Sequence, residues 1–190
     1  MIKSEAFVTP FWQTQLPEDI DIQWLIDLAY EQKEEDNVIN NCGGWQGFKY
    51  NQVGMLPIPQ GLILQKFIEI EVNNVLQELG IDWHQDLLNY WLNINPSGAY
   101  NESHKHGRAR VVGNLYLEVP ENSGELVLHR DDTAWYHVPN NLDNPCVAIK
   151  KTIMPKTRDI ILFPGWVTHS VNLNKSSKDR ISLSFNYGDL

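Results

Sequence analysis

The chain of 190 residues carries 15 Lys and Arg against 24 Asp and Glu, a formal net charge of −9. This length suits one domain, so we expect residues 1–190 to form a single domain. The acidic balance offers no broad basic surface for nucleic-acid phosphates, and no apolar run approaches the roughly 20 residues that a membrane span needs. Two cysteines are too few for a disulfide scaffold or a thiolate zinc site. The N-terminal stretch does not resemble a secretory signal, so we expect a soluble, cytoplasmic protein.

Residues 1–86 are predicted to form a helical support with a long loop. Apolar residues recur at helical spacing in two stretches, one over 22–30 and one over 60–79. Gly80 stands where a C′ glycine would end the second helix. The segment between them, 37–59, is rich in Asn, Gly and Pro. We interpret it as an irregular loop and, as a hypothesis, as a lid that folds over a pocket.

From residue 87 onward the pattern changes to short strands. Apolar residues alternate with polar ones, and turn signals separate the runs. The predicted strands are 88–94, 111–119, 125–129, 134–138, 146–153, 159–163 and 180–187. Short strands at regular spacing are typical of a β-sandwich or a double-stranded β-helix (jelly roll). We therefore predict a mainly β protein whose residues 87–190 form a jelly roll, with the two N-terminal helices packed on its outside.

Three histidines are candidates for a metal site. His104 and His106 form an H-x-H pattern, and in an extended chain residues i and i+2 project to the same side. Imidazole suits Fe(II), Zn(II) and Cu(II). His169 follows the predicted strand 159–163 and a Pro-Gly turn, so in a jelly roll it would close over the same end. Each histidine alone is more simply a surface or core residue, whereas the three in this order predict a metal centre.

Arg180 begins the last predicted strand and shares one of its faces with Ser182. Burying a guanidinium without a partner is costly, so this position calls for an anion. A ligand carboxylate bound bidentately, with the Ser182 hydroxyl beside it, would satisfy the arginine. The alternative is an internal salt bridge to one of the 24 acidic residues.

The ordered set of motifs resembles the 2-oxoglutarate- and Fe(II)-dependent oxygenases, and within them a small group of bacterial and phage proteins with the same layout. The motifs that carry the resemblance are, in chain order, Gly43–Gly47, Trp91–Asn93, His104–His106, Asn114–Leu117, Leu162–Trp166, His169 and Arg180–Asn186. Each motif is weak alone, but as an ordered set covering most of the chain they are fairly specific.

The resemblance implies a role for each matching position. His104 and His169 match the family's two histidine ligands of Fe(II), and 2-oxoglutarate would be the co-substrate. The implied contacts to 2-oxoglutarate are Arg180, Ser182, Tyr116 and Asn93. Trp91 and Trp166 would wall the substrate pocket, or they are ordinary core aromatic residues.

His106 departs from the family pattern, because most of these oxygenases have a carboxylate there. Three neutral imidazoles leave the site one negative charge poorer. We interpret His106 as the third iron ligand. In the alternatives, His106 turns away and water or a remote carboxylate completes the site, or the chain is an inactive relative.

The implied activity is a dioxygenase reaction that hydroxylates a small-molecule or peptide substrate and releases succinate and CO₂. A second interpretation is a cupin-like metalloenzyme that does not use 2-oxoglutarate. Cupins usually place a Glu shortly after H-x-H, whereas here no acidic residue occurs before Glu118. A third is a non-catalytic jelly-roll binding module with incidental histidines.

Overall fold

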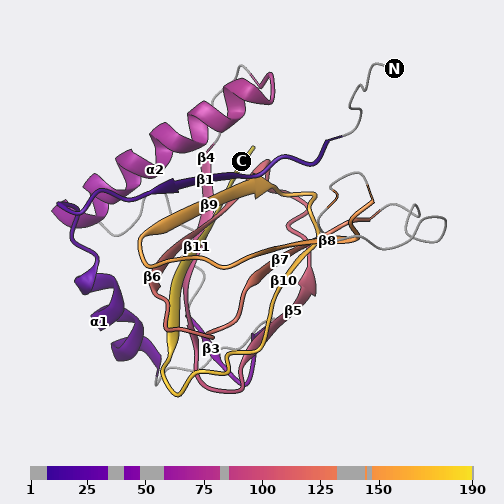
Figure 1. Ribbon diagram of the computed structural model, residues 1–190. Helices are drawn as coiled ribbons and strands as arrows, with labels where there is room; N and C mark the ends of the chain where they lie inside the picture. The colour runs from indigo at the N-terminus through magenta and orange to yellow at the C-terminus, as the bar shows by residue number, and fades with distance from the viewer. Residues whose placement is uncertain are drawn as a thin grey trace.

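A computed structural model describes residues 8–33, 41–47, 58–81, 86–131, 144 and 147–189. Over these residues the chain forms two antiparallel sheets and two helices, which confirms the prediction of a mainly β protein (Figure 1). The six-stranded sheet has the order β1-β9-β6-β11-β4-β3: Trp12–Gln15, Asp159–Pro164, Val111–Glu118, Arg180–Gly188, Asp86–Asn95 and Trp45–Gln46. The five-stranded sheet has the order β2-β5-β10-β7-β8: Asn41–Cys42, Tyr100–His104, His169–Val171, Leu126–His129 and Lys150–Ile153.

The two helices form where the apolar spacing predicted them, as α1 (Gln23–Gln32) and α2 (Pro59–Glu78). Their buried residues pack with one face of the six-stranded sheet into a single cluster. The helical part of that cluster includes Leu25, Ala29, Leu64, Ile68, Val72, Val75 and Leu76. Tyr30 ends the apolar stretch 22–30 that predicted α1, but its side chain is exposed and its hydroxyl donates to the carboxylate of Asp179.

The end of α2 has the predicted glycine geometry. Gly80 has a φ of 72°, in the left-handed region that favours glycine. Its N–H bonds to the carbonyl of Gln77 at 3.0 Å, and the N–H of Ile81 bonds to that of Leu76 at 2.9 Å. This pair of bonds is a Schellman motif, which satisfies the last carbonyls of the helix.

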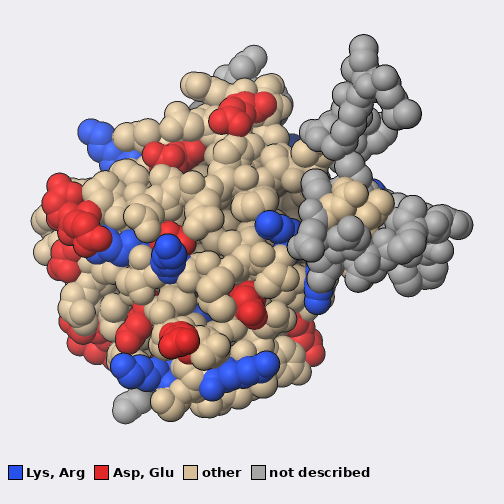
Figure 2. Space-filling model, in the orientation of Figure 1, with Lys and Arg blue, Asp and Glu red and all other residues tan. Residues whose placement is uncertain are grey.

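No helix in the described part of the chain is both long and apolar enough to cross a membrane. On the face of the molecule shown in Figure 2, acidic and basic side chains are interspersed.

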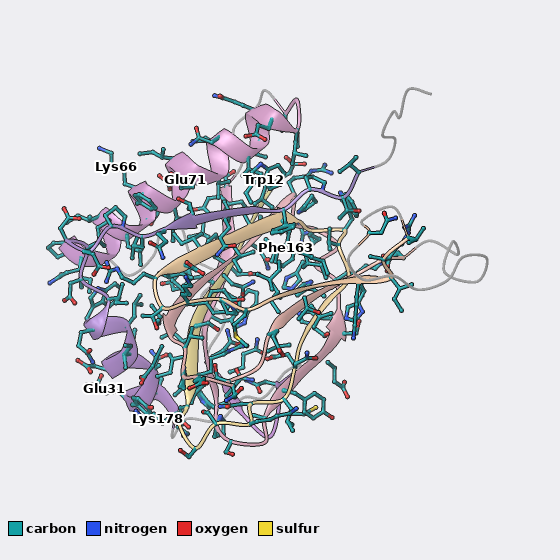
Figure 3. The ribbon with its side chains drawn as sticks, in the orientation of Figure 1. Trp12, Glu31, Lys66, Glu71, Phe163 and Lys178 are labelled. Carbon is teal, nitrogen blue, oxygen red and sulfur yellow. The ribbon has the colours of Figure 1, made fainter. Side chains whose placement is uncertain are left out.

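A second apolar cluster lies between the two sheets. Val112 and Tyr116 on β6 and Phe163 on β9 pack against Leu126 and Leu128 on β7. Figure 3 labels Phe163, whose ring lies between the sheets. The residues of β6 that alternate with these, Val111, Leu115 and Leu117, pack in the cluster beneath the helices. The two faces of β6 therefore belong to two different apolar clusters, as the alternation of side chains along a strand predicted.

Five strands were not predicted as such. β5 carries His104 and β10 carries His169, and β1, β2 and β3 lie at sheet edges. Of the predicted strands, 146–153 begins only at Lys150, and 134–138 lies outside the described residues.

The predicted loop 37–59 is partly ordered as strands. Its described residues 41–47 contribute β2 to one sheet and β3 to the other, and its last two residues, 58–59, are the N-cap and the first residue of α2. Here the prediction of an irregular loop was wrong, because Asn41 and Trp45 pair with Asn101 and Ile94 in the two sheets. The remainder of the predicted lid lies outside the described residues.

Candidate metal centre and co-substrate pocket

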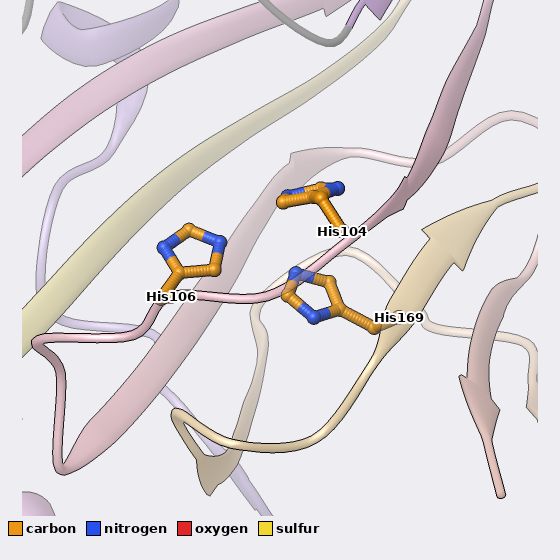
Figure 4. Close-up of side chains that lie close together, drawn as sticks. All are labelled: His104, His106 and His169. Atoms are coloured by element: carbon orange, nitrogen blue, oxygen red, sulfur yellow. The ribbon is translucent and has the colours of Figure 1, made fainter. Parts of the chain in front are cut away.

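Three histidines from two segments meet at one point. His104 ends β5 and His169 begins β10, and the two are directly paired in the β5–β10 ladder. His106 lies two residues beyond the end of β5. One ligand atom from each imidazole lies within 4.8 Å of the others, and the rings point toward a common centre (Figure 4). Within the described part of the chain, no Asp or Glu joins this cluster.

Backbone carbonyls orient two of the imidazoles. The Nδ1 of His104 lies 2.7 Å from the carbonyl oxygen of Glu102, and that of His169 lies 3.0 Å from the carbonyl oxygen of Val167. A carbonyl only accepts, so Nδ1 carries a proton in both rings, which leaves Nε2 as the nitrogen that a metal would use. Burial and the neighbouring His104 lower the pKa of His169 to about 3. His169 is therefore neutral at pH 7, as a metal ligand must be.

His106 is held by contacts outside the strand ladder. Its backbone N–H donates to the carbonyl of Gly165 at 3.1 Å. Its ring stacks on Trp91 of β4, with centroids 5.7 Å apart and planes 11° apart. The structure thus brings His106 into the cluster rather than turning it away.

Arg180 is buried without an acidic partner. It is 3% exposed, and one Nη donates to the carbonyl of Gly124 at 3.2 Å. Its Nε has no partner, and no ion pair joins it to a carboxylate among the described residues. The internal salt bridge considered from the sequence is therefore absent from this part of the chain. Burial lowers the pKa of Arg180, but a guanidinium stays charged at pH 7.

A row of polar side chains crosses four neighbouring strands beside Arg180. Ser182 on β11 pairs with Asn93 on β4 and with Tyr116 on β6. Asn93 donates to the hydroxyl of Ser184 at 3.0 Å, and Gln46 on β3 donates to the Asn93 carbonyl at 3.3 Å. Burial raises the pKa of Tyr116 to about 12, so its hydroxyl keeps its proton at pH 7.

These groups line one cavity, which is partly open to solvent. The lining includes all three histidines and the predicted contacts Arg180, Ser182, Tyr116, Asn93 and Trp91. Sequence reasoning gave no role to Gln46, Asn101 or Asn114, although Gln46 and Asn114 belong to two of the quoted motifs. Trp166 does not line the cavity and is 57% exposed, so the structure does not support its predicted place in the pocket wall.

Residues 89–186, just over half of the chain, match the model of a family described as "Putative 2OG-Fe(II) oxygenase". The chain belongs to the 2OG-Fe(II) oxygenase family. The resemblance seen in the sequence is thereby confirmed, and Fe(II) and 2-oxoglutarate are the cofactors that this family uses. No curated protein matches this oxygenase.

Solved structures share the fold of the oxygenase over nearly its whole length. A prolyl-4-hydroxylase from Pseudomonas putida is 15% identical, with a TM-score of 0.69, covering 96% of this chain and 94% of its own. A prolyl hydroxylase from Trichoplax adhaerens, in complex with a hypoxia-inducible-factor peptide, is 16% identical, with a TM-score of 0.64 and coverages of 94% and 83%. HygX from Streptomyces hygroscopicus, with nickel and 2-oxoglutarate bound, is 11% identical, with a TM-score of 0.57 and coverages of 95% and 83%.

The residues of the oxygenase fit both cofactors. Two imidazoles with Nδ1 bound to carbonyls, and a third ring beside them, form a nitrogen donor set suited to Fe(II). The Nε of the buried Arg180 is a hydrogen-bond donor that has no acceptor in the structure. The distal carboxylate of 2-oxoglutarate is an acceptor of the opposite charge and could fill this place.

Replacing Gly165 with Ala should loosen the metal centre. A Cβ there would collide with the carbonyl oxygen of Ala109 and lie 2.8 Å from that of His106. The turn and the segment 106–109 would have to separate, which we expect to cost about 1–3 kcal/mol of stability and to weaken Fe(II) binding. Thermal unfolding and anaerobic Fe(II) titration measure both effects.

Gly107→Ala is the matched control for Gly165→Ala. Gly107 lies in the same segment, and a Cβ there meets nothing within 4 Å. If the two variants have the same stability and the same Fe(II) affinity, then the close contact at Gly165 is not what holds the segment 106–109 in place.

Proposed function

We propose that this oxygenase is an Fe(II)- and 2-oxoglutarate-dependent dioxygenase that hydroxylates a small-molecule or peptide substrate and releases succinate and CO₂. We further propose that it is one cytoplasmic domain built on a double-stranded β-helix (jelly roll). The observation that carries the proposal is that Arg180, buried and without a carboxylate partner among the described residues, lines the same cavity as three convergent histidines. A metal-only enzyme would leave this arginine without a role.

In this proposal the chain's side chains divide into two groups. His104, His106 and His169 hold the iron, the first and third through Nε2. Arg180 binds the distal carboxylate of 2-oxoglutarate, with the hydroxyls of Ser182 and Tyr116 beside it. Asn93 lines the same space and is oriented by Gln46 and Ser184.

Fe(II) and 2-oxoglutarate together supply the activation of molecular oxygen, coupled to decarboxylation of the keto acid. The protein's own contribution is position and environment. The strand ladder sets the distance between His104 and His169, and the apolar cluster between the sheets keeps water from one side of the cavity. Trp91 stacks on His106 and limits how far that ring can rotate.

The cavity lining restricts the substrate by charge. Among the described lining residues none is acidic, and Gln46, Asn101 and Asn114 present neutral amides. These amides favour a substrate that offers neutral hydrogen-bonding groups to the iron site. Peptides and small metabolites both fit this description, and the Trichoplax neighbour was solved with a peptide.

An anaerobic titration tests the proposed function. Fe(II) and 2-oxoglutarate added together should produce the visible charge-transfer band of a chelated keto acid, and either alone should not. We expect 2-oxobutyrate, which keeps the keto acid but lacks the distal carboxylate, to bind at least about 30-fold more weakly, because Arg180 loses its partner.

Two other results would contradict this function. Fe(II) binding with no response to 2-oxoglutarate would favour a cupin-like metalloenzyme. No metal binding at all would favour a binding module without catalysis.

A further inference from the structure

A carboxylate outside the cavity links the two segments that carry the histidines. The Nζ of Lys105 lies 2.5 Å from Oδ2 of Asp131. The Thr168 hydroxyl lies 2.7 Å from Oδ1 and 2.9 Å from Oδ2 of the same residue. We call these three residues the clasp.

The clasp residues are adjacent in sequence to the proposed ligands. Lys105 stands between His104 and His106, and Thr168 directly precedes His169. Asp131 follows the end of β7, which pairs with β10. One carboxylate therefore contacts both ligand-bearing segments from a third segment.

The strand ladder alone does not fix all three ligands. His104 and His169 are paired within it, but β5 ends at His104 and leaves His106 beyond the ladder. The backbone between His104 and His106 is thus held by Lys105 on one side and by the bond to Gly165 on the other. Burial raises the pKa of Asp131, but hydrogen bonds from Lys105 and Thr168 outweigh it and lower that pKa overall, so the carboxylate is ionised at pH 7.

We propose that Lys105, Asp131 and Thr168 are positioning residues that set the distance between His106 and His169 and so tune iron affinity. The inference rests on the proposed function, because it takes the three histidines as the iron ligands. Outer groups bonded directly to a ligand commonly change metal affinity by about 10–100-fold. The clasp acts through the backbone and is half exposed, so we expect a smaller effect, about three- to tenfold.

The test compares Asp131→Ala and Asp131→Asn with wild type in anaerobic Fe(II) titrations and in the visible spectrum of the Co(II)-loaded protein. We expect Asp131→Ala to weaken Fe(II) binding about three- to tenfold and to alter the Co(II) spectrum, which reports ligand geometry. Asp131→Asn keeps an acceptor for Thr168 and should recover part of the affinity. Lys105→Ala combined with Asp131→Ala should cost less than the sum of the two single changes, because the residues act as one unit.

Glu125→Ala is the matched control. Glu125 directly precedes β7, and it accepts a bond from Asn172 at 3.0 Å. It thus joins the β7 segment to the β10 segment, as Asp131 does through Thr168, but away from the histidines. The clasp is overturned if Asp131→Ala binds Fe(II) like wild type, or if Glu125→Ala weakens it equally. A wild-type protein that binds no Fe(II) overturns the proposed function itself, which is a distinct result.

Discussion

Replacing Arg180 with Leu should weaken 2-oxoglutarate binding by at least about 30-fold while leaving the ligand-free protein as stable as wild type or more stable. Truncating one partner of a buried charge pair costs about 2–5 kcal/mol, and each 1.4 kcal/mol is tenfold in affinity. In the ligand-free protein the same arginine is buried with no carboxylate beside it in the described structure. Removing an uncompensated buried charge relieves its desolvation cost. Isothermal titration and thermal unfolding, with and without 2-oxoglutarate, measure the two effects.

Two comparisons isolate the role of Arg180. Arg180→Lys keeps the positive charge but loses the planar guanidinium that can bind a carboxylate through two hydrogen bonds. This variant should therefore bind 2-oxoglutarate more weakly than wild type and more tightly than Arg180→Leu. For 2-oxobutyrate, which lacks the distal carboxylate, Arg180→Leu should change affinity little. A large loss of stability in the ligand-free Arg180→Leu protein would instead assign this arginine a structural role.

The apolar elements could be predicted from the sequence because burial leaves a periodic pattern. Apolar residues recur at the helical period over 22–30 and 60–79, and at every second position in the strand that begins at Arg180. In each of these elements the residues of one face pack into the apolar cluster and those of the other face do not, so the sequence itself carries the repeat.

The strands that carry the metal site could not be predicted in this way. β5 reads Tyr-Asn-Glu-Ser-His and β10 reads His-Ser-Val. Asn101, His104, His169 and Val171 of these two strands line the cavity, and three of the four remaining residues are exposed, so neither strand has an apolar repeat. The histidines were found instead by their chemistry, through H-x-H spacing and chain order. Neutral amides such as Asn101 have no such signature, and only the fold brings them to the cavity.

The histidine at the usual carboxylate position is consistent with its surroundings. The ring of His106 stacks on Trp91, a contact between aromatic rings that a carboxylate at this position could not make. An imidazole can stack there and still present a nitrogen to the metal. The contact with Trp91 therefore suits an aromatic side chain at position 106, and in the proposed iron site this side chain would replace a carboxylate and its negative charge.

Replacing His169 with Ala should abolish Fe(II) binding, with at least about a 100-fold loss of affinity, because the loss of a ligand exceeds the 10–100-fold typical of outer groups. His169 faces His104 across the ladder, with ring centroids 4.3 Å apart, so its removal opens one side of the cluster. The ring also packs edge-on against Phe163 at 4.7 Å, and the truncation should cost about 1–3 kcal/mol of stability. Anaerobic titration with Fe(II), beside thermal unfolding of the metal-free protein, separates the two losses.

His129→Ala is the control that makes the His169 result specific. His129 ends β7, is partly buried and bonds through Nε2 to the Ser170 hydroxyl at 2.8 Å, yet it is not part of the metal cluster. The His129→Ala variant should be somewhat less stable than wild type and should keep the wild-type affinity for Fe(II). His169→Gln, which retains more of the side-chain volume, should recover stability without recovering the metal. If His169→Ala still bound Fe(II) tightly, the iron would have to be held elsewhere, and the convergence of three imidazoles would need another explanation.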